Sequence, residues 1–151
     1  MSRHVDTSLY WHVPLCWHPF KLKDETLGAI TELREANINS VMITGDNLLT
    51  AIAVGEECGI YSKDNSVILP DITNGVLKWR YYNSHELLDE IQLSQDEKYI
   101  FALTGSDLKW ITQNRPDLIN YIMVHGRIFA RVNPDEKAEI VERYEVKWKT
   151  S

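Results

Sequence analysis

The chain has 151 residues, 44% of them hydrophobic and 25% charged, and a formal net charge of −6. These values are typical of one globular domain with a substantial core, and the acidic balance argues against a nucleic-acid partner because no basic stripe is present. No apolar run approaches the roughly 20 residues that cross a bilayer, so we expect no direct membrane contact by this segment.

The amino-terminal residues 1–19 differ from the rest of the chain. They contain three side chains of the metal-binding type, His12, Cys16 and His18. Because a known ligand spacing is missing, we predict no metal site and interpret residues 1–19 as disordered or foreign to the domain. Residues 20–146 then form the predicted domain and 147–151 a tail, in a reduced, cytosolic setting.

The first regular element is a helix that Asp24 can cap and that ends near residues 36–37. Its apolar face contains Leu27, Ile30 and Leu33. The apolar run 41–43 then predicts a buried strand, which stops at the polar turn 44–47. A second helix follows the turn and ends at Gly59, where a left-handed cap is expected. Its apolar face contains Leu48, Ala51, Ile52 and Gly55.

We interpret residues 61–74 as a polar connection with a short apolar run that Pro70 closes. The spacing of Asn83 and Glu86 is that of a capping box, which predicts a helix ending near Leu93. The expected strands of the second half are 76–82, 99–103 and 127–132, and the expected helices are 106–114, 118–124 and 134–145. Strands that alternate with helices predict an α/β domain with three layers around a mainly parallel, Rossmann-like sheet.

The last helix begins with a well-formed cap. Asn133 is the expected N-cap, Pro134 takes the first helical position and Glu136 can return a hydrogen bond to the cap. This places Lys137 in the first helical turn, beyond the carboxyl end of the strand 127–132, where ligands collect in open α/β sheets. The side chains expected to face inward are Ala138, Val141 and Tyr144.

The turn Thr44–Asn47 follows a strand and precedes a helix, which is the geometry that aims amide N–H groups and a hydroxyl at an anion. Gly45 allows a sharp turn and a close approach of the backbone to a ligand. The alternative is an ordinary connection in which Asp46 or Asn47 caps the helix.

Lys137 supplies a compact positive charge that suits a phosphoryl oxygen, although surface lysines are common. A hydroxyl-bearing turn on one strand and a capped lysine on a later one together form two parts of a phosphoryl-transfer site. Arg131 either contacts a nucleotide phosphate or ribose, or forms an interface ion pair. The similar turn at Thr104–Gly105 is interpreted as structural, with Ser106 or Asp107 as the N-cap.

Two sequence blocks, 42–54 and 124–137, resemble the phosphorylation domain of P-type ATPases. The detail at His125–Gly126 and at residues 101–105 looks most like the P5 branch, whose members transport polyamines or other cations. The resemblance extends over residues 21–144 and implies a haloacid-dehalogenase-like fold, here incomplete.

This resemblance implies a role for each candidate site residue. Thr44 would donate its hydroxyl to the transferred phosphoryl group, and Gly45 would offer its backbone N–H. Lys137 would neutralise charge on the phosphoryl group and on the nucleophilic aspartate. Asp46 would bind the nucleotide or arrange the turn, and Arg131 would lie close to bound nucleotide.

The family's nucleophile motif Asp-Lys-Thr-Gly-Thr and its magnesium motif Gly-Asp-Gly-x-Asn-Asp do not occur in residues 1–151. Because covalent catalysis requires the nucleophile, we expect this chain alone to form no aspartyl-phosphate. ATP and Mg²⁺ are cofactors of the parent family, and we expect neither to bind tightly to this chain alone. The implied partners are the nucleotide-binding, actuator and transmembrane domains of a parent protein in an endolysosomal or other endomembrane, with this domain on the cytosolic side.

Two other functions remain open from the sequence. One is a small haloacid-dehalogenase-like phosphatase that uses Asp46 or Asp107 as its nucleophile. The other is a non-catalytic module that binds a nucleotide or a partner protein.

Overall fold

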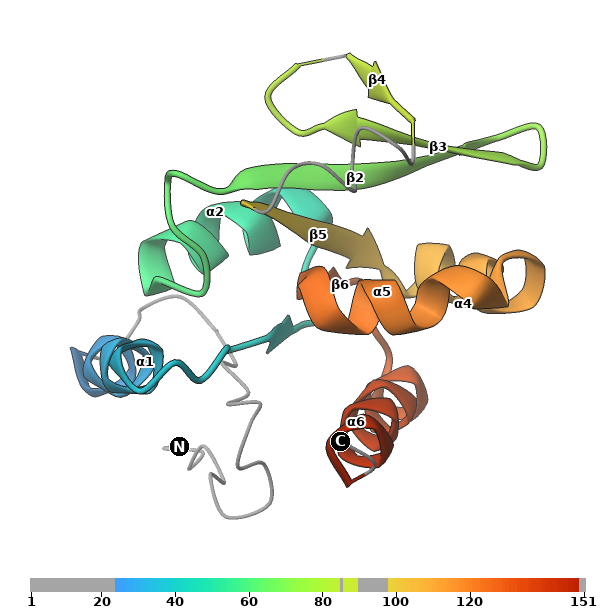
Figure 1. The fold of residues 1–151 in the computed structure, drawn as a ribbon. Coiled ribbons are helices and arrows are strands. Elements are labelled where there is room, and N and C mark those ends of the chain that lie inside the picture. Colours follow the sequence, from blue (N-terminus) through green and yellow to red (C-terminus); the bar gives the residue numbers. More distant parts are fainter. Residues whose placement is uncertain (1–23, 85, 90–97, 150–151) are drawn as a thin grey trace.

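The computed structural model describes residues 24–84, 86–89 and 98–149 (Figure 1). The interpretation of residues 1–19, and the end of the helix expected near Leu93, lie outside the described residues. Within the described residues, no helix is long and apolar enough to span a bilayer.

In the described part of the chain, one sheet has six strands in the order β1-β6-β5-β2-β3-β4. The bounds are β1 Met42–Ile43, β2 Ser66–Thr73, β3 Val76–Tyr81, β4 Leu87–Leu88, β5 Tyr99–Thr104 and β6 Gly126–Ala130. Strands β1, β6, β5 and β2 pair in parallel, whereas β3 and β4 extend the sheet in antiparallel. The predicted parallel arrangement is therefore confirmed for the four strands that include those of the candidate site.

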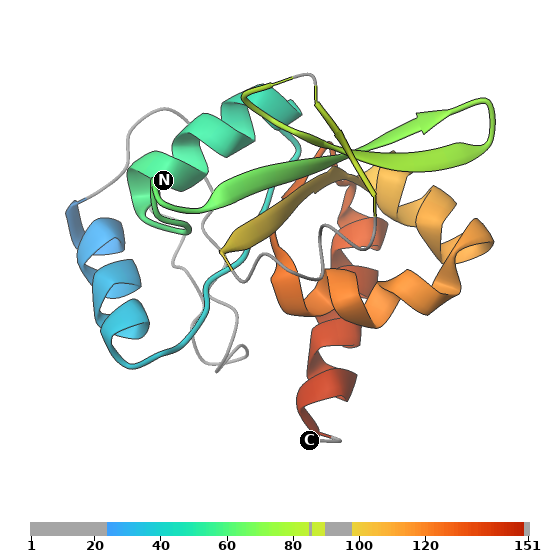
Figure 2. The same cartoon turned by 45° about the horizontal axis from the view of Figure 1, so that its top comes forward.

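Helices cover both faces of this sheet, which confirms the predicted three layers (Figures 1 and 2). The bounds are α1 Asp24–Glu35, α2 Leu48–Cys58, α4 Gly105–Asn114, α5 Ile119–His125 and α6 Pro134–Lys149, with the short 3₁₀ helix η1 at Pro116–Leu118. Helices α1 and α2 share one hydrophobic cluster with the sheet, and α4, α5 and α6 share the other.

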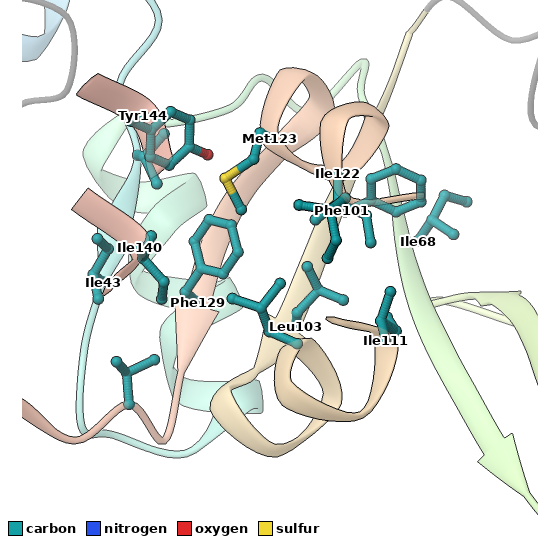
Figure 3. Close-up of a cluster of buried hydrophobic side chains, with 14 of the residues drawn as sticks. Ile43, Ile68, Phe101, Leu103, Ile111, Ile122, Met123, Phe129, Ile140 and Tyr144 are labelled. Atoms are coloured by element: carbon teal, nitrogen blue, oxygen red, sulfur yellow. The ribbon is translucent and has the colours of Figure 1, made fainter. Parts of the chain in front are cut away.

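The core alternates along the central strands. Phe101 and Leu103 of β5 and Phe129 of β6 are fully buried in the larger cluster, against α4, α5 and α6 (Figure 3). Their neighbours Ala102 and Ile128 belong to the cluster on the opposite face, which includes residues of α2. Successive side chains of a strand point to opposite faces, so strands this apolar must be covered on both.

Helix α2 forms where its terminal signals predict it. The Asn47 side chain accepts a hydrogen bond from the Thr50 N–H at 2.8 Å, and Gly59 ends the helix in the left-handed conformation with a φ of 77°. Its buried residues include Ala51, Ile52 and Gly55, as expected. The helix start is thus fixed directly after the candidate turn.

Strand β2 shows that the interpretation of residues 61–74 as a polar connection was wrong. Its central residues, 67–70, are buried between β5 and β3. Pro70 does not end the strand, because pairing with β5 stops at Ile68 while pairing with β3 continues to Thr73. A proline has no N–H to donate, so it is tolerated in a strand where one edge is no longer paired with a neighbouring strand.

The prediction of a helix from the spacing of Asn83 and Glu86 was also wrong for the described residues 86–89. Leu87 and Leu88 form β4, which pairs in antiparallel with Trp79 and Arg80 of β3. Cross-strand pairing and the burial of Leu88 outweigh a capping signal that is only local.

Helix α6 begins as predicted and runs four residues beyond the expected end, to Lys149. Val141 and Tyr144 are buried as predicted, but Ala138 is exposed and Ile140 is buried in its place. The buried face of α6 is therefore shifted from the predicted one, and Ile140 belongs with Ile43 and Phe129 to the larger hydrophobic cluster (Figure 3).

Candidate functional site

The turn after β1 is joined to the end of β6 and to the segment that follows it by three backbone hydrogen bonds. The Thr44 N–H donates to the Phe129 carbonyl at 2.9 Å, and the Val132 N–H donates to the Thr44 carbonyl at 3.1 Å. The Arg131 N–H donates to the Asp46 carbonyl at 2.9 Å. Residues that are far apart in the sequence therefore meet at the carboxyl edge of the parallel strands.

Thr44 is buried, with 5% of its surface exposed, and its hydroxyl oxygen accepts a hydrogen bond from the Asp46 N–H at 3.1 Å. This contact holds the turn in shape. A hydroxyl that accepts one bond still has its hydrogen to donate. The Thr44 side chain is thus held firmly and keeps a donor for an acceptor at this edge.

Gly45 is exposed and has neither of the usual structural reasons to be glycine. Its φ is not positive, and a Cβ there would meet only the Val132 carbonyl, at an ordinary 3.9 Å. The backbone does bend at residues 45 and 46, as expected, but this bend does not require the left-handed conformation that favours glycine. Freedom for a ligand to approach the backbone is the explanation that remains from the sequence.

Asn47 caps α2, which decides between the two predicted caps. The Asp46 carboxylate is therefore not used by the cap, and Asp46 is exposed. It stands beside the turn as a charged group open to solvent.

The start of α6 has the predicted capping box. The Asn133 N–H donates to Glu136 Oε2 at 3.0 Å, and the Glu136 N–H donates to Asn133 Oδ1 at 2.8 Å. The Lys137 N–H donates to the Asn133 carbonyl at 2.9 Å, and the residue is half-buried. Lys137 therefore lies in the first turn of a helix whose start directly follows Val132, the residue bonded to Thr44.

The start of α4 meets the same edge. A Cβ on Gly105 would lie 2.5 Å from Glu136 Oε2 and 3.0 Å from the Arg131 carbonyl oxygen, so the starts of α4 and α6 are in close contact. Sequence reasoning missed this contact. The repeated Thr-Gly pair at 104–105 was its only visible signal.

Thr104, rather than Ser106 or Asp107, is the N-cap of α4. Its hydroxyl oxygen accepts from the Asp107 N–H at 3.1 Å. In return, Asp107 Oδ2 accepts from the Thr104 N–H at 2.9 Å and from its hydroxyl at 2.7 Å. The Asp107 carboxylate is committed to this cap, which supports the structural interpretation of the turn.

Arg131 has a left-handed backbone with a φ of 52°, which is strained for a residue with a side chain. It is exposed, and the described residues offer it no ion-pair partner. Together with Lys137, it provides positive charge beside the Thr44 turn.

Magnesium would need oxygen ligands with one or two carboxylates. Among residues 24–84, 86–89 and 98–149, no three His, Cys, Asp or Glu side chains are grouped as a metal site. The donors at this edge fit an anion, whereas a cation would find no such group of ligands in the described residues.

Comparison with known proteins identifies the family. No protein-family model matches the chain. The chain is 34% identical over 148 residues to the Polyamine-transporting ATPase 13A3 of Macaca fascicularis, covering 81% of this chain and 12% of that protein. It is 34% identical over 146 residues to the Probable cation-transporting ATPase 13A4 of Mus musculus, covering 83% of this chain and 12% of that protein.

A fungal protein is similar over a comparable length. The vacuolar cation-transporting ATPase of Saccharomyces cerevisiae is 31% identical over 144 residues, covering 80% of this chain and 10% of that protein. The chain thus spans only about an eighth of the length of the first of these relatives. From the identity and its extent, the chain belongs to the P5 (13A) family of P-type cation-transporting ATPases.

Proposed function

We propose that residues 20–146 are part of the phosphorylation domain of an ATP-driven cation- or polyamine-transporting ATPase, and that this edge binds the transferred phosphoryl group. The observation that carries the proposal is the set of backbone hydrogen bonds that joins Thr44 and Asp46 to Arg131 and Val132. They bring a hydroxyl, a free amide and two cationic residues to one edge of a parallel sheet, where such sheets bind ligands.

Each residue has a distinct task in this proposal. Thr44 donates its hydroxyl hydrogen to a phosphoryl oxygen, and Gly45 donates its backbone N–H. Lys137 neutralises negative charge on the phosphoryl group, since an ammonium acts as a compact point charge. Asp46 and Arg131 contact the nucleotide at the rim, where both are exposed.

ATP is the proposed source of the phosphoryl group, and Mg²⁺ would neutralise its phosphates when bound. The residues at this edge fit the phosphoryl group, but the described residues do not fit the metal. The nucleophilic aspartate is also not in these 151 residues. We therefore assign aspartyl-phosphate formation to the complete ATPase, together with its nucleotide-binding, actuator and transmembrane domains in an endomembrane.

The test uses phosphorylation of the complete ATPase by radiolabelled ATP and Mg²⁺, with acid quench and hydroxylamine treatment. Lys137→Gln and Thr44→Ala should each lower the hydroxylamine-sensitive label at least tenfold, since one stabilising group of such a site is typically worth that much. Lys109→Gln, an exposed lysine of α4, is the matched control and should keep the label. Normal labelling of both site variants would overturn the assignment.

A second arm uses the 151-residue chain alone. It should give no hydroxylamine-sensitive phosphoprotein, because the nucleophile motif is absent. Label on the isolated chain would favour the soluble phosphatase. Of its two candidate nucleophiles, Asp107 is the less suitable, because its carboxylate is engaged in the α4 cap. Nucleotide binding without turnover, in a complete protein that is not labelled, would favour the non-catalytic module.

A further inference from the structure

A pocket lies at the amino-terminal edge of the parallel strands, opposite the candidate phosphoryl site. It has a volume of about 350 Å³. Residues at or just before the starts of the four parallel strands line it, namely Ser40, Asn65, Tyr99 and Arg127. Ser40 and Thr44 stand at the two ends of β1, four residues apart, so this pocket is about 13 Å along the strand from the candidate phosphoryl site.

The pocket has a strongly uneven charge. Arg34, from the end of α1, and His125 and Arg127, from the junction of α5 and β6, contribute to its wall. The described residues that line it include no Asp or Glu. The whole chain has a net charge of −6, so a pocket lined by two arginines and by no carboxylate among the described residues differs in sign from the chain as a whole.

Both arginines also lie near the carboxyl ends of helices, which accounts for part of their placement. Arg34 Nη1 is 3.6 Å from the position of a Cβ on Gly59, the C-cap of α2. Arg127 Nη1 donates to the carbonyls of Val124 and Gly126, each at 2.9 Å. Cations are favourable at these ends. Yet a guanidinium has more N–H donors than these contacts use, in a fork that matches phosphate oxygens.

Tyr99 provides an independent observation. It lines the pocket and is 4% exposed, and its buried hydroxyl has no hydrogen-bond partner in the described part of the chain. Buried polar atoms without a partner are rare in native proteins and call for an explanation such as a bound group. The helix-capping role of the arginines does not supply one.

The surroundings of His125 agree with a positive field. Burial lowers the pKa of this imidazole first, and the positive charges of Arg127 and Lys147 lower it further. Its ring stacks on Tyr99 with centroids 4.8 Å apart. The unpartnered hydroxyl and the uncompensated charge therefore lie within one small cluster.

We propose that this pocket binds a phosphate monoester, with Arg34 and Arg127 as its cationic ligands and the Tyr99 hydroxyl as a neutral donor. The shared chemistry is a doubly charged tetrahedral anion, either free in solution or on a lipid headgroup. The proposal is independent of the candidate phosphoryl site, since none of the residues Thr44, Gly45 and Lys137 lines this pocket.

The first experiment titrates the 151-residue chain with inorganic phosphate and follows the ring signals of Tyr99 and His125 by NMR. Arg34→Gln should weaken the response about tenfold, as expected for a charge-assisted hydrogen bond. Arg34 is exposed, so this variant should fold. Tyr99→Phe, which removes only the hydroxyl, should weaken binding of phosphate to a smaller extent, measured by the His125 signals.

Two controls make the result specific. Arg80→Gln removes an arginine on β3 that does not line the pocket, and should leave the titration unchanged. Lys137→Gln removes the cation of the other edge and should also leave it unchanged. If Lys137→Gln abolishes the response and Arg34→Gln does not, phosphate binds at the candidate phosphoryl site. The proposal for this pocket then fails, whereas the proposed function does not.

A flotation assay distinguishes the source of the anion. Vesicles of phosphatidylcholine, with and without phosphatidylinositol 4-phosphate, are mixed with the chain and with Arg34→Gln. Binding only to the phosphorylated vesicles, lost in the variant, assigns the pocket to a lipid headgroup. A response to free phosphate without flotation assigns it to a soluble phosphate monoester. No response in either assay, or a response that Arg34→Gln does not change, overturns the proposal.

Discussion

The carboxylate of Glu136 lies against Gly105, in the space that any larger side chain at residue 105 would need. A Cβ there would be 2.5 Å from Glu136 Oε2. The same oxygen accepts the Asn133 N–H in the cap of α6. One carboxylate therefore connects the starts of two helices, and packing at Gly105 depends on the geometry of the α6 cap.

Gly105→Ala should destabilise the protein by about 1–3 kcal/mol, because the new methyl group also meets the Arg131 carbonyl oxygen at 3.0 Å. Gly28→Ala is the matched control. Nothing lies within 4 Å of a Cβ on Gly28, which is inside α1, so this change should stabilise by up to about 1 kcal/mol. Urea denaturation measures both, and equal midpoints for the two variants would contradict the assigned contact.

Gly45→Ala should leave the free energy of unfolding within about 0.5 kcal/mol of the original, since no atom crowds a Cβ there and its φ is not positive. In the complete ATPase of the proposed function, the same change should slow phosphorylation by ATP, because a methyl group would stand where we propose that the phosphoryl oxygen approaches the backbone. Loss of stability without loss of phosphorylation would show that Gly45 has a structural role only.

Tyr99→Phe should leave stability unchanged or raise it, because it removes a buried hydroxyl that has no partner. Tyr61→Phe is its counterpart. The Tyr61 hydroxyl donates to the Ile52 carbonyl at 2.8 Å, so its removal should lower the free energy of unfolding by about 1 kcal/mol. Burial, mainly, raises the pKa of Tyr61 to about 12. Thermal or urea unfolding measures the stability of both variants. A greater loss of stability for Tyr99→Phe than for Tyr61→Phe would contradict the prediction.

Stability should decrease in mild acid through His125. Burial and the nearby cations lower the pKa of the folded imidazole from its ordinary value of 6.5. The unfolded chain then binds the proton more readily, so the stability is fully present above pH 6.5 and is lost as the pH falls below it. His125→Gln should flatten this slope of the unfolding free energy against pH. An unchanged slope would locate the titration elsewhere.

Three helix ends could be predicted from local signals, although Thr104, and not Ser106 or Asp107, caps α4. Asn47, Gly59 and Asn133 act through contacts within a few residues, and the structure uses each as a cap. By contrast, β2 and β4 depend on partners elsewhere in the chain. Pro70 suggested a break in β2, and the capping-box spacing suggested a helix at β4, because neither local signal carries information about pairing with β3.

The position of the candidate site followed from the general rule for parallel sheets, because the turn 44–47 and the segment 131–137 follow strands that proved to be neighbours. The chemical roles of Thr44, Gly45, Asp46, Arg131 and Lys137 stay predictions. The contact of Glu136 with Gly105 and the pocket at the amino-terminal edge had no sequence signal of comparable strength, since they depend on how helices settle on the sheet.

The three backbone hydrogen bonds between residues 44–46 and 129–132 have a mechanical consequence. Two segments that are bonded to each other in this way should move as one rigid unit when neighbouring parts of the protein tilt or rotate. In the proposed ATPase, the Thr44 turn and the start of α6 would then keep a fixed relation, and a change in ligand binding at this edge would come from other parts of the protein that move against it.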